Sequence, residues 1–335
     1  MEYRYLGRTG VKVSQLCLGT MMFGRSAGEA DSLAIIRHAL DNGINFVDTA
    51  DVYGFGESER IVGKALSGRR EQIILATKVF FPLDKDDRNG RGLSRRHLID
   101  ACEASLRRLG TDWIDLYQMH RPQAEVPIDE TLRALDDLIR AGKVRYIGTS
   151  MFPAWKIVEA LWAAKELGLN RFVSEQPTYH LLDRTVEREV LPAAQTFGLA
   201  VLPWAPLCGG LLTGKYTRGD VSAEGRWQGG KDNFERLITE PAFKLIDAHI
   251  AHAEDKGCTP AQLALAWNMA QPGVTASIIG PRKLAQLVDN LGACAVKLDA
   301  VDFERIDAMA PPKSATMAYY DAALASDTRP NLSRW

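Results

Sequence analysis

Three short apolar stretches each end in a side chain that can hold or move a proton. Asp48 follows INFV, Lys78 follows ILAT and His120 follows WIDLYQM, while Tyr53 comes five residues after Asp48. An ammonium group beside a phenol favours the phenolate and lowers the pKa of a tyrosine from about 10. We therefore predict that Lys78, kept charged by Asp48, tunes Tyr53 as a proton donor to a carbonyl oxygen that is becoming an alkoxide. His120 can hydrogen-bond the same oxygen and orient the substrate.

Packing alone would also explain any one of these residues. Asp48 and Lys78 could form a buried ion pair, with Tyr53 and His120 as packing side chains. The spacing favours the chemical interpretation, because three successive strand candidates end in such a residue and Tyr53 lies in the loop between two of them.

Eight apolar runs alternate with helical patterns, which predicts a parallel α/β architecture. The runs end at residues 19, 48, 78, 120, 150, 176, 204 and 280, and most steps are close to the roughly 30 residues of one βαβ unit. This spacing predicts a (β/α)8 TIM barrel with its active site at the carboxyl ends of the strands. Helices are expected over Asp31–Asn42, Leu98–Leu109, Thr131–Ala141, Ala154–Leu167, Thr259–Met269 and Lys283–Leu291.

Three segments lie outside the repeating strand–helix units, and we expect them to cover the two ends of the barrel. They are an N-terminal hairpin across Gly7–Gly10, a long loop after the seventh strand at roughly 205–258, and a C-terminal tail. Residues 1–335 are thus expected to form a single barrel domain. A competing open doubly wound sheet would carry GxGxxG after its first strand. This chain has CLGTMMFG there and GxGxxG nowhere, which favours the barrel.

The charge balance excludes a strongly basic nucleic-acid binder, because 41 Lys and Arg face 42 Asp and Glu. The N-terminus lacks the apolar core of a signal peptide and no run reaches about 18 apolar residues, so we expect no membrane span. The five cysteines form no CxxC pair, which is typical of a reducing compartment and indicates a cytoplasmic protein. No metal-ligand spacing is present, and we expect His249 and His252 to be solvated.

Seven segments, in order along the chain, resemble motifs of the aldo-keto reductase family. They are DTADVYGFGESE (48–59), TK (77–78), YQMHRP (117–122), AGKVRYIGTS (141–150), EQPTY (175–179), PWAPLCGGLLTGKY (203–216) and IGPRKLAQLVDN (279–290). The chain is similar to bacterial-type NADP-dependent members, related to the potassium-channel beta-subunit-like branch. The resemblance implies a (β/α)8 barrel that uses NADPH, less often NADH, to interconvert carbonyls and alcohols. It places a catalytic tetrad on Asp48, Tyr53, Lys78 and His120, with Tyr53 as the proton donor.

The resemblance also implies cofactor contacts at the strand ends and in the loops that follow them. Residues expected near the nicotinamide and its ribose are Gly19, Thr20, Met21, Asp48, Ser150, Gln176 and Trp204, the last stacked on the ring. Residues expected along the pyrophosphate and the adenosine half are Ala205, Pro206, Leu207, Gly209, Gly210, Lys215, Arg226, Gly280, Arg282, Gln286 and Asn290. Gly280 precedes a helix whose N-terminus favours anions, and the guanidinium fork of Arg282 suits a 2′-phosphate. We therefore expect NADPH rather than NADH.

Two positions depart from the family pattern. Met151 stands where the family commonly has Asn, and its thioether cannot bond strongly to a carboxamide, which leaves Ser150 and Gln176 to hold that group. His180 replaces an Asn found in many relatives, and we interpret it as a change in a structural or substrate loop. The substrate is expected to be a small carbonyl compound. Its pocket is expected to be lined by Phe23, Tyr53, Phe80, Phe81 and His120, together with the 205–240 insertion and the tail from Pro311 to Trp335.

Other functions remain open on these residues. A Schiff-base aldolase would use Lys78 as a nucleophile, but it needs that amine neutral, and Asp48 favours the charged form. An NADPH-binding regulatory or sensor protein with little turnover is the second alternative, and an intact tetrad argues against it. The segment Gly209–Lys215 is nearly a phosphate-binding loop of ATPases, but Tyr216 stands where the Ser or Thr would be. The sequence does not indicate an oligomeric state.

Overall fold

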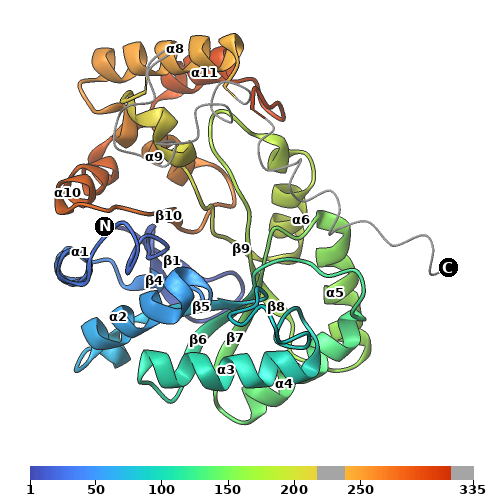
Figure 1. Ribbon diagram of the computed structural model, residues 1–335. Coiled ribbons are helices and arrows are strands. Elements are labelled where there is room, and N and C mark those ends of the chain that lie inside the picture. The colour runs from blue at the N-terminus through green and yellow to red at the C-terminus, as the bar shows by residue number, and fades with distance from the viewer. Residues whose placement is uncertain (217–237, 318–335) are drawn as a thin grey trace.

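Eight short parallel strands form the centre of the fold in the computed structural model, which describes residues 1–216 and 238–317 (Figure 1). Their order is β10–β3–β4–β5–β6–β7–β8–β9. They are β3 (Leu16–Gly19), β4 (Phe46–Asp48), β5 (Ile74–Val79), β6 (Ile114–Met119), β7 (Val144–Ser150), β8 (Phe172–Gln176), β9 (Ala200–Val201) and β10 (Ser277–Ile279). The predicted (β/α)8 architecture is confirmed.

The two edge strands of this sheet, β9 and β10, approach each other and close the barrel. Val201 pairs with Val274 in a parallel bridge, and its carbonyl oxygen accepts the N–H of Thr275 at 2.8 Å. Further along, the N–H of Ile278 donates to the carbonyl oxygen of Pro203 at 2.9 Å. The junction is narrow, so few ladder bonds hold it, and the residues that follow each strand lie on the same end of the barrel.

Side chains of alternate strand residues fill the barrel interior, as the two-residue period of a strand requires. The buried members of this interior cluster are Leu6, Val13, Cys17, Phe46, Ala76, Leu116, Ala200, Leu202, Ala276 and Ile278. A larger apolar cluster lies between the outer face of the strands and the helices. Gly19 is required where β3 meets β10, because a Cβ there would lie 2.6 Å from Cγ2 of Ile278.

The helices form the outer layer, with α3, α4 and α5 following one another around the barrel in Figure 1. They are α1 (Glu29–Asp41), α2 (Glu57–Leu66), α3 (Arg95–Leu109), α4 (Ile128–Arg140), α5 (Ala154–Glu166), α6 (Val190–Phe197), α8 (Glu240–Lys256), α9 (Pro260–Ala270), α10 (Leu284–Gly292) and α11 (Ala300–Met309). All six predicted helices are present, with ends within three residues of the expected ones. Local signals fix them: α3, for example, begins at the Ser94 cap and ends at left-handed Gly110.

The N-terminal hairpin pairs β1 (Tyr3–Tyr5) with β2 (Lys12–Ser14) in antiparallel register. The side chains of Leu6 and Val13 belong to the interior cluster. The hairpin therefore covers the end of the barrel opposite the carboxyl ends of the strands. Gly7, at φ +58°, makes the close approach possible, because a Cβ there would lie 2.6 Å from the carbonyl oxygen of Val173.

The segment 205–258, expected as a loop, contains α8, and residues 217–237 within it lie outside the described part. The buried face of α8 includes His249 and His252, which are 0% and 2% exposed, so the expectation that both are solvated is wrong. His249 Nε2 lies 2.8 Å from the carbonyl oxygen of Pro260, and His252 Nε2 lies 2.9 Å from Oδ1 of Asp302. These polar partners satisfy one ring nitrogen of each histidine, which lets both side chains lie on the buried face of α8.

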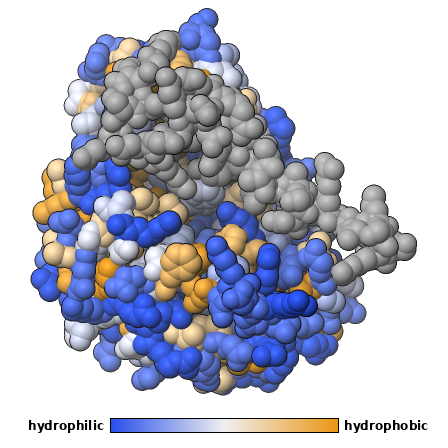
Figure 2. Space-filling view, viewed as in Figure 1, coloured by the Kyte–Doolittle hydropathy of each residue, from blue (hydrophilic) through white to orange (hydrophobic). Residues whose placement is uncertain are grey.

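The outer surface is largely hydrophilic on the face shown in Figure 2, with hydrophobic residues in small separate patches. Among the described residues, no helix combines the length and the apolar character that crossing a membrane would require.

Candidate active site

An ion pair lies at the centre of the barrel, at the carboxyl ends of two neighbouring strands. Asp48 ends β4 and Lys78 lies near the end of β5, and each follows a member of the interior cluster by two residues, which points it inward. Lys78 Nζ donates to Oδ1 of Asp48 and, at 2.8 Å, to the carbonyl oxygen of Thr49. Burial lowers the pKa of Lys78, but Asp48 and Tyr53 more than offset this, so the net shift is upward and the amine is charged.

Tyr53 reaches this ion pair from the loop after β4, as the spacing predicts. Its hydroxyl oxygen accepts a hydrogen bond from Lys78 Nζ at 3.3 Å. The expected fall in its pKa does not occur: burial raises the pKa of Tyr53, and the opposing effect of Lys78 is smaller. Tyr53 is therefore a protonated phenol at neutral pH, which is the state that a proton donor needs.

His120 follows β6 and packs its ring edge-on against two aromatic rings, those of Tyr53 at 5.8 Å and Phe81 at 5.0 Å between centroids. Burial lowers its pKa well below 6.5, and the positive charges of Lys78 and Arg121 lower it further. The ring is therefore neutral, with one nitrogen able to donate. Its Nδ1 is buried and has no hydrogen-bond partner among the described residues, which leaves the ring positioned by packing.

Gln118 completes the centre, and the sequence interpretation missed it. It is fully buried, and its Nε2 donates to Oδ2 of Asp48 at 2.9 Å. Gln176, at the end of β8, donates to the same oxygen at 2.9 Å and to Oε1 of Gln118 at 3.1 Å. One Asp48 oxygen thus faces the Lys78 side of the site and the other faces the two amides. A signal was available: Gln118 stands two residues before His120, on the inward side of a strand.

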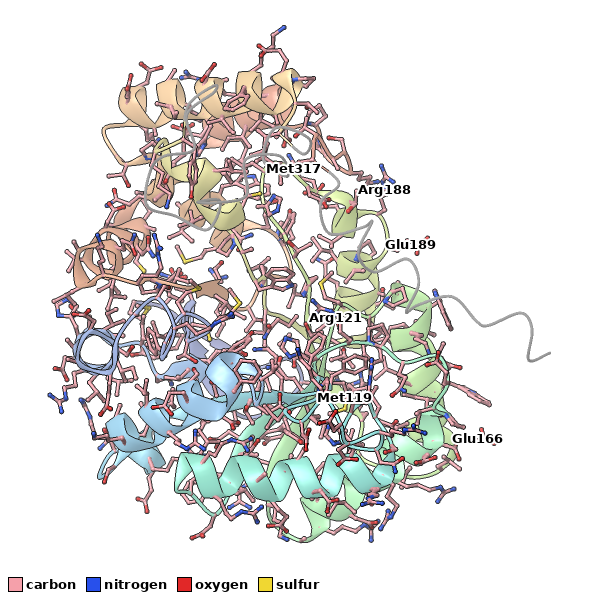
Figure 3. The ribbon with its side chains drawn as sticks, in the orientation of Figure 1. Met119, Arg121, Glu166, Arg188, Glu189 and Met317 are labelled. Atoms are coloured by element: carbon pink, nitrogen blue, oxygen red, sulfur yellow. The ribbon has the colours of Figure 1, made fainter. Side chains whose placement is uncertain are left out.

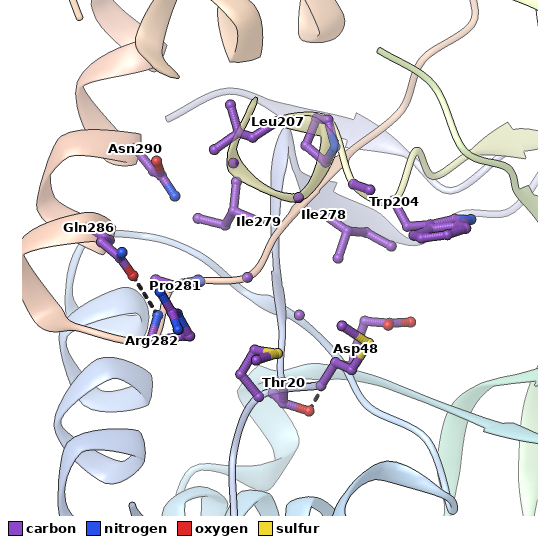
Figure 4. Close-up of a pocket in the computed structure, with 18 of the residues that line it drawn as sticks. Thr20, Asp48, Trp204, Leu207, Ile278, Ile279, Pro281, Arg282, Gln286 and Asn290 are labelled. Atoms are coloured by element: carbon purple, nitrogen blue, oxygen red, sulfur yellow. Dashed lines mark hydrogen bonds between the residues drawn. The ribbon is translucent and has the colours of Figure 1, made fainter. Parts of the chain in front are cut away.

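A cavity of about 610 Å³ opens above these residues and extends to α10. Figure 4 shows its long shape, with Trp204 on one side and Arg282 and Gln286 on the other. Described residues expected at the cofactor or substrate that line it are Gly19, Thr20, Met21, Asp48, Tyr53, Phe81, His120, Ser150, Gln176, Trp204, Ala205, Pro206, Leu207, Gly209, Gly210, Lys215, Gly280, Arg282, Gln286 and Asn290. The strand ends and loops therefore bring most of the expected residues to one cavity.

Two cations lie near each other at the α10 end of this cavity. Burial lowers the pKa of Lys215, and the charge of Arg282 lowers it further, so the two repel. The backbone N–H of Arg282 donates to Oε1 of Gln286 at 2.8 Å, which fixes the turn that leads into α10. Neighbouring cations beside a helix N-terminus fit a ligand with several negative charges, such as a phosphorylated dinucleotide.

Met151, which stands where the family commonly has Asn, lies beside Trp204. Met151 takes a left-handed backbone, φ +61°, and its sulfur accepts a hydrogen bond from Trp204 Nε1 at 3.2 Å. Behind it, the carboxyl of Glu175 accepts the N–H of Phe152 at 3.1 Å, and burial raises the pKa of Glu175 to about 8. Met151 thus contacts the aromatic residue expected at the nicotinamide, and a buried carboxyl holds the loop that carries Met151.

Comparison with known proteins identifies the chain. A model of the aldo/keto reductase family matches residues 15–311. The protein belongs to the aldo/keto reductase family. Members of this family generally use nicotinamide cofactors. Membership indicates that this chain is an oxidoreductase, and it supports carbonyl reduction as the type of reaction.

Three relatives illustrate the breadth of the match. An uncharacterized oxidoreductase, YrpG, of Bacillus subtilis is 45% identical, with 89% of this chain and 93% of the relative covered. A probable voltage-gated potassium channel subunit beta of rice, Oryza sativa subsp. japonica, is 37% identical, with 88% and 91% covered. Versiconal hemiacetal acetate reductase of Aspergillus parasiticus is 34% identical, with 94% and 98% covered.

Some residues expected at the site of this aldo/keto reductase lie elsewhere. Phe23 and Phe80 do not line the cavity, because both are buried in the large outer cluster. Lys78 lies behind the surface of the cavity, where it contacts Asp48 and Tyr53. Arg226 and the tail from 318 fall outside the described residues. Lining residues that the sequence interpretation did not assign are Met22, Arg25, Val52, Arg121, Thr259, Ala261, Ile278, Ile279, Pro281 and Asp289.

Proposed function

We propose that this aldo/keto reductase is an NADPH-dependent reductase of aldehydes or ketones, with Tyr53 as the proton donor. The observation that carries the proposal is the buried Asp48–Lys78–Tyr53 chain beside a cavity whose other end holds Lys215 and Arg282. A small carbonyl compound would lie against Tyr53 and His120. The relative named versiconal hemiacetal acetate reductase supports reduction as the direction of the reaction.

The chain's own residues handle the proton. When bound, the reduced nicotinamide supplies a hydride, which forms the new C–H bond at the carbonyl carbon. The O–H bond of Tyr53 breaks as the substrate oxygen takes its proton, and Lys78 stabilises the resulting phenolate until solvent returns a proton. Neutral His120 donates a hydrogen bond that holds the substrate oxygen. The aldehyde or ketone thereby gains two hydrogens and becomes an alcohol.

Residues along the cavity would hold the cofactor in parts. Ser150 and the Oε1 atom of Gln176 suit the carboxamide, since Gln176 Nε2 is engaged by Asp48 and Gln118. The indole of Trp204 offers a surface for the ring. Lys215 would meet the pyrophosphate and Arg282 the 2′-phosphate, which supports NADPH over NADH.

The test is a panel of aldehydes and ketones followed by loss of absorbance at the NADPH band, with wild type and Tyr53→Phe side by side. We expect wild type to turn over several of them and Tyr53→Phe to lose about 10²- to 10⁴-fold in kcat. Cofactor affinity, measured by fluorescence titration, should stay near wild type. A regulatory protein with little turnover predicts instead that the two proteins give the same rate, and that outcome would overturn the proposal.

A further inference from the structure

The loop that carries Tyr53 turns sharply through three residues with a left-handed backbone. Gly54, Phe55 and Gly56 follow Tyr53 directly, with φ values of 58°, 55° and 89°. Phe55 is not a glycine and is 69% exposed, so its own burial offsets little of the cost of this conformation. Contacts elsewhere must therefore hold the turn that places the Tyr53 hydroxyl.

Arg108, near the end of α3, packs its side chain directly against this turn. A Cβ at Gly56 would lie 2.6 Å from Cδ of Arg108 and 3.0 Å from its Nε, so any side chain at position 56 would displace the arginine. The guanidinium is held by two further bonds, because its Nε donates to Oε2 of Glu59 at 2.6 Å and its Nη2 donates to Oγ of Ser105 at 3.1 Å. The turn therefore packs against an arginine whose own position depends on Glu59 and Ser105.

Glu59 extends this link to β5, the strand that carries Lys78. Its side chain is fully buried, and its second oxygen, Oε1, accepts a hydrogen bond from Thr77 Oγ1 at 2.6 Å. Thr77 precedes Lys78, so the two side chains point to opposite faces of the strand, Lys78 toward the barrel centre and Thr77 toward α2. The next residue of β5, Val79, pairs with Met119 of β6, which Figure 3 shows near the middle of the molecule. One buried carboxylate thus connects this strand with the left-handed turn.

A second acidic side chain, Asp51, lies near Glu59 but does not take over its role. Asp51 is 2% exposed, and its Oδ1 has no hydrogen-bond partner among the described residues. Burial raises the pKa of Asp51 well above its usual range, and the charge of Glu59 raises it further, so Asp51 favours the protonated form. The carboxylate that binds Arg108 is therefore that of Glu59.

Ser58 anchors the start of α2 independently of its neighbour Glu59. Its Oγ donates to the carbonyl oxygen of Thr20 at 2.9 Å and lies 3.0 Å from Oγ1 of Thr49, which ties the helix to the residues that follow β3 and β4. All three of these side chains are fully buried. Because this anchor remains when Glu59 is changed, we expect a Glu59 variant to keep the barrel and to lose only the buried link.

We infer that Glu59 is a positioning residue for the proton transfer, because it holds the turn after Tyr53 in a fixed place relative to Lys78. Through Arg108 it holds the turn, and through Thr77 it holds the strand that carries the amine. This inference rests on the proposed function, since it assigns Glu59 to the proton that Tyr53 would donate. Glu59 is absent from the described lining of the cavity, so it acts through other residues rather than by touching substrate or cofactor.

Glu59→Gln is the first test, because it keeps the size of the side chain and an acceptor for Thr77 but removes the charge that binds Arg108. We expect kcat to fall by about 10- to 100-fold, since a small displacement of a reacting group costs this much, while NADPH affinity stays near wild type. Glu57→Gln is the matched control. It removes a carboxylate from the same helix, where Glu57 pairs with exposed Arg60 at 3.2 Å, and kcat should not change. A wild-type kcat in Glu59→Gln would contradict the inference.

A Tyr53→Phe background shows whether Glu59 acts through Tyr53. With the phenol absent, adding Glu59→Gln should lower the remaining kcat by less than about threefold, because the group that it positions is gone. A purely structural role predicts the same fold loss in both backgrounds, and that result would refute the inference. The solvent isotope effect on kcat gives a second readout that does not need the Tyr53→Phe rate. It should be larger in Glu59→Gln than in wild type, because a displaced phenol transfers its proton more slowly, and equal effects would count against positioning.

A double variant separates loss of stability from loss of position. Glu59→Gln leaves the guanidinium of Arg108 unpaired in a mostly buried site, which destabilises the fold. Adding Arg108→Met removes that charge and keeps an apolar stem against Gly56, so the urea midpoint should recover while kcat stays low. Return of kcat together with the midpoint would mean that the pair serves only the fold. Absence of turnover by wild type with every carbonyl compound would instead overturn the proposed function itself.

Discussion

The two ends of the cavity are built in different ways. At the barrel centre, Asp48, Lys78 and Gln118 stand on strands, are at most 2% exposed, and bond to one another across neighbouring strands. At the α10 end, Lys215 and Arg282 stand in loops, and burial lowers the pKa of Lys215, with a smaller contribution from the charge of Arg282. The barrel-centre end is therefore held together by its own hydrogen bonds, whereas the α10 end brings two cations close to each other in loops.

Removing Lys78 should give the largest effect, because that residue pairs with buried Asp48 and also contacts Tyr53, the proposed proton donor. Lys78→Met leaves Asp48 buried without its cation, and breaking such a pair costs about 3–5 kcal/mol in the free energy of unfolding. It also removes the charge that stabilises the Tyr53 phenolate, so kcat should fall by at least about 10²-fold. Urea unfolding and steady-state rates measure the two losses separately.

The double variant Asp48→Asn with Lys78→Met sharpens this result. Without either charge the burial penalty disappears, so most of the lost stability should return while kcat stays low. Recovery of activity together with stability would mean that Lys78 acts only as a structural cation. That outcome would erase the distinction between the two ends.

Arg282→Met should produce a different pattern, in which the affinity for NADPH falls. If the guanidinium binds the 2′-phosphate, the dissociation constant for NADPH should rise by about 10- to 100-fold and that for NADH by less than about threefold. The melting temperature without cofactor, measured for both proteins, reports any separate effect on folding. Fluorescence titration with both cofactors checks this, and equal losses for the two would refute the 2′-phosphate role.

Sequence reasoning succeeded where chain spacing alone determines position. Asp48, Lys78 and His120 end successive strands, and a barrel must bring such ends together, so their convergence could be predicted. The spacing could not weigh burial against charge, which is why the pKa of Tyr53 shifts upward rather than downward. Gln118 was missed because a polar residue inside an apolar strand acquires its meaning only when Asp48 and Gln176 arrive from other strands.

Failures in the fold have a similar physical origin. Helix α8 buries His249 and His252 on the same face as apolar residues, and their polar partners Pro260 and Asp302 lie elsewhere in the chain. The residue type alone therefore did not show that these two positions are buried. Phe23 follows the first strand in sequence, as a substrate residue could, yet its ring is fully buried in the outer cluster. Spacing places a residue near the end of a strand but does not decide which way its side chain turns.

Gln118→Leu tests whether activity depends on the amide groups that hydrogen-bond Asp48 at the barrel centre. The change keeps the size roughly constant and removes a donor to Asp48 and the acceptor of Gln176. We expect kcat to fall about tenfold, corresponding to about one charge-assisted hydrogen bond, with a small change in NADPH affinity. Gln72→Leu, at an exposed position, is the control and should leave kcat unchanged. A wild-type rate in Gln118→Leu would show that Lys78 and Gln176 hold Asp48 in place without the Gln118 amide.

The pH profile gives the smallest effect and compares the two ends in one experiment. Burial lowers the pKa of His120 well below 6.5, so the ring stays neutral as the pH falls through the range where a solvated histidine would gain a proton. The pKa values of Tyr53 and Lys78 are raised, and that of Glu175 is raised to about 8, so these groups keep their protons. Between about pH 5.5 and about 7.5, kcat should therefore vary by less than about twofold.

NADPH affinity should vary more over the same range, because a phosphate monoester titrates near about pH 6 and Arg282 would bind its dianion best. An inflection of kcat near the ordinary pKa of histidine would show that the barrel centre admits water and is less rigidly assembled than its hydrogen bonds indicate.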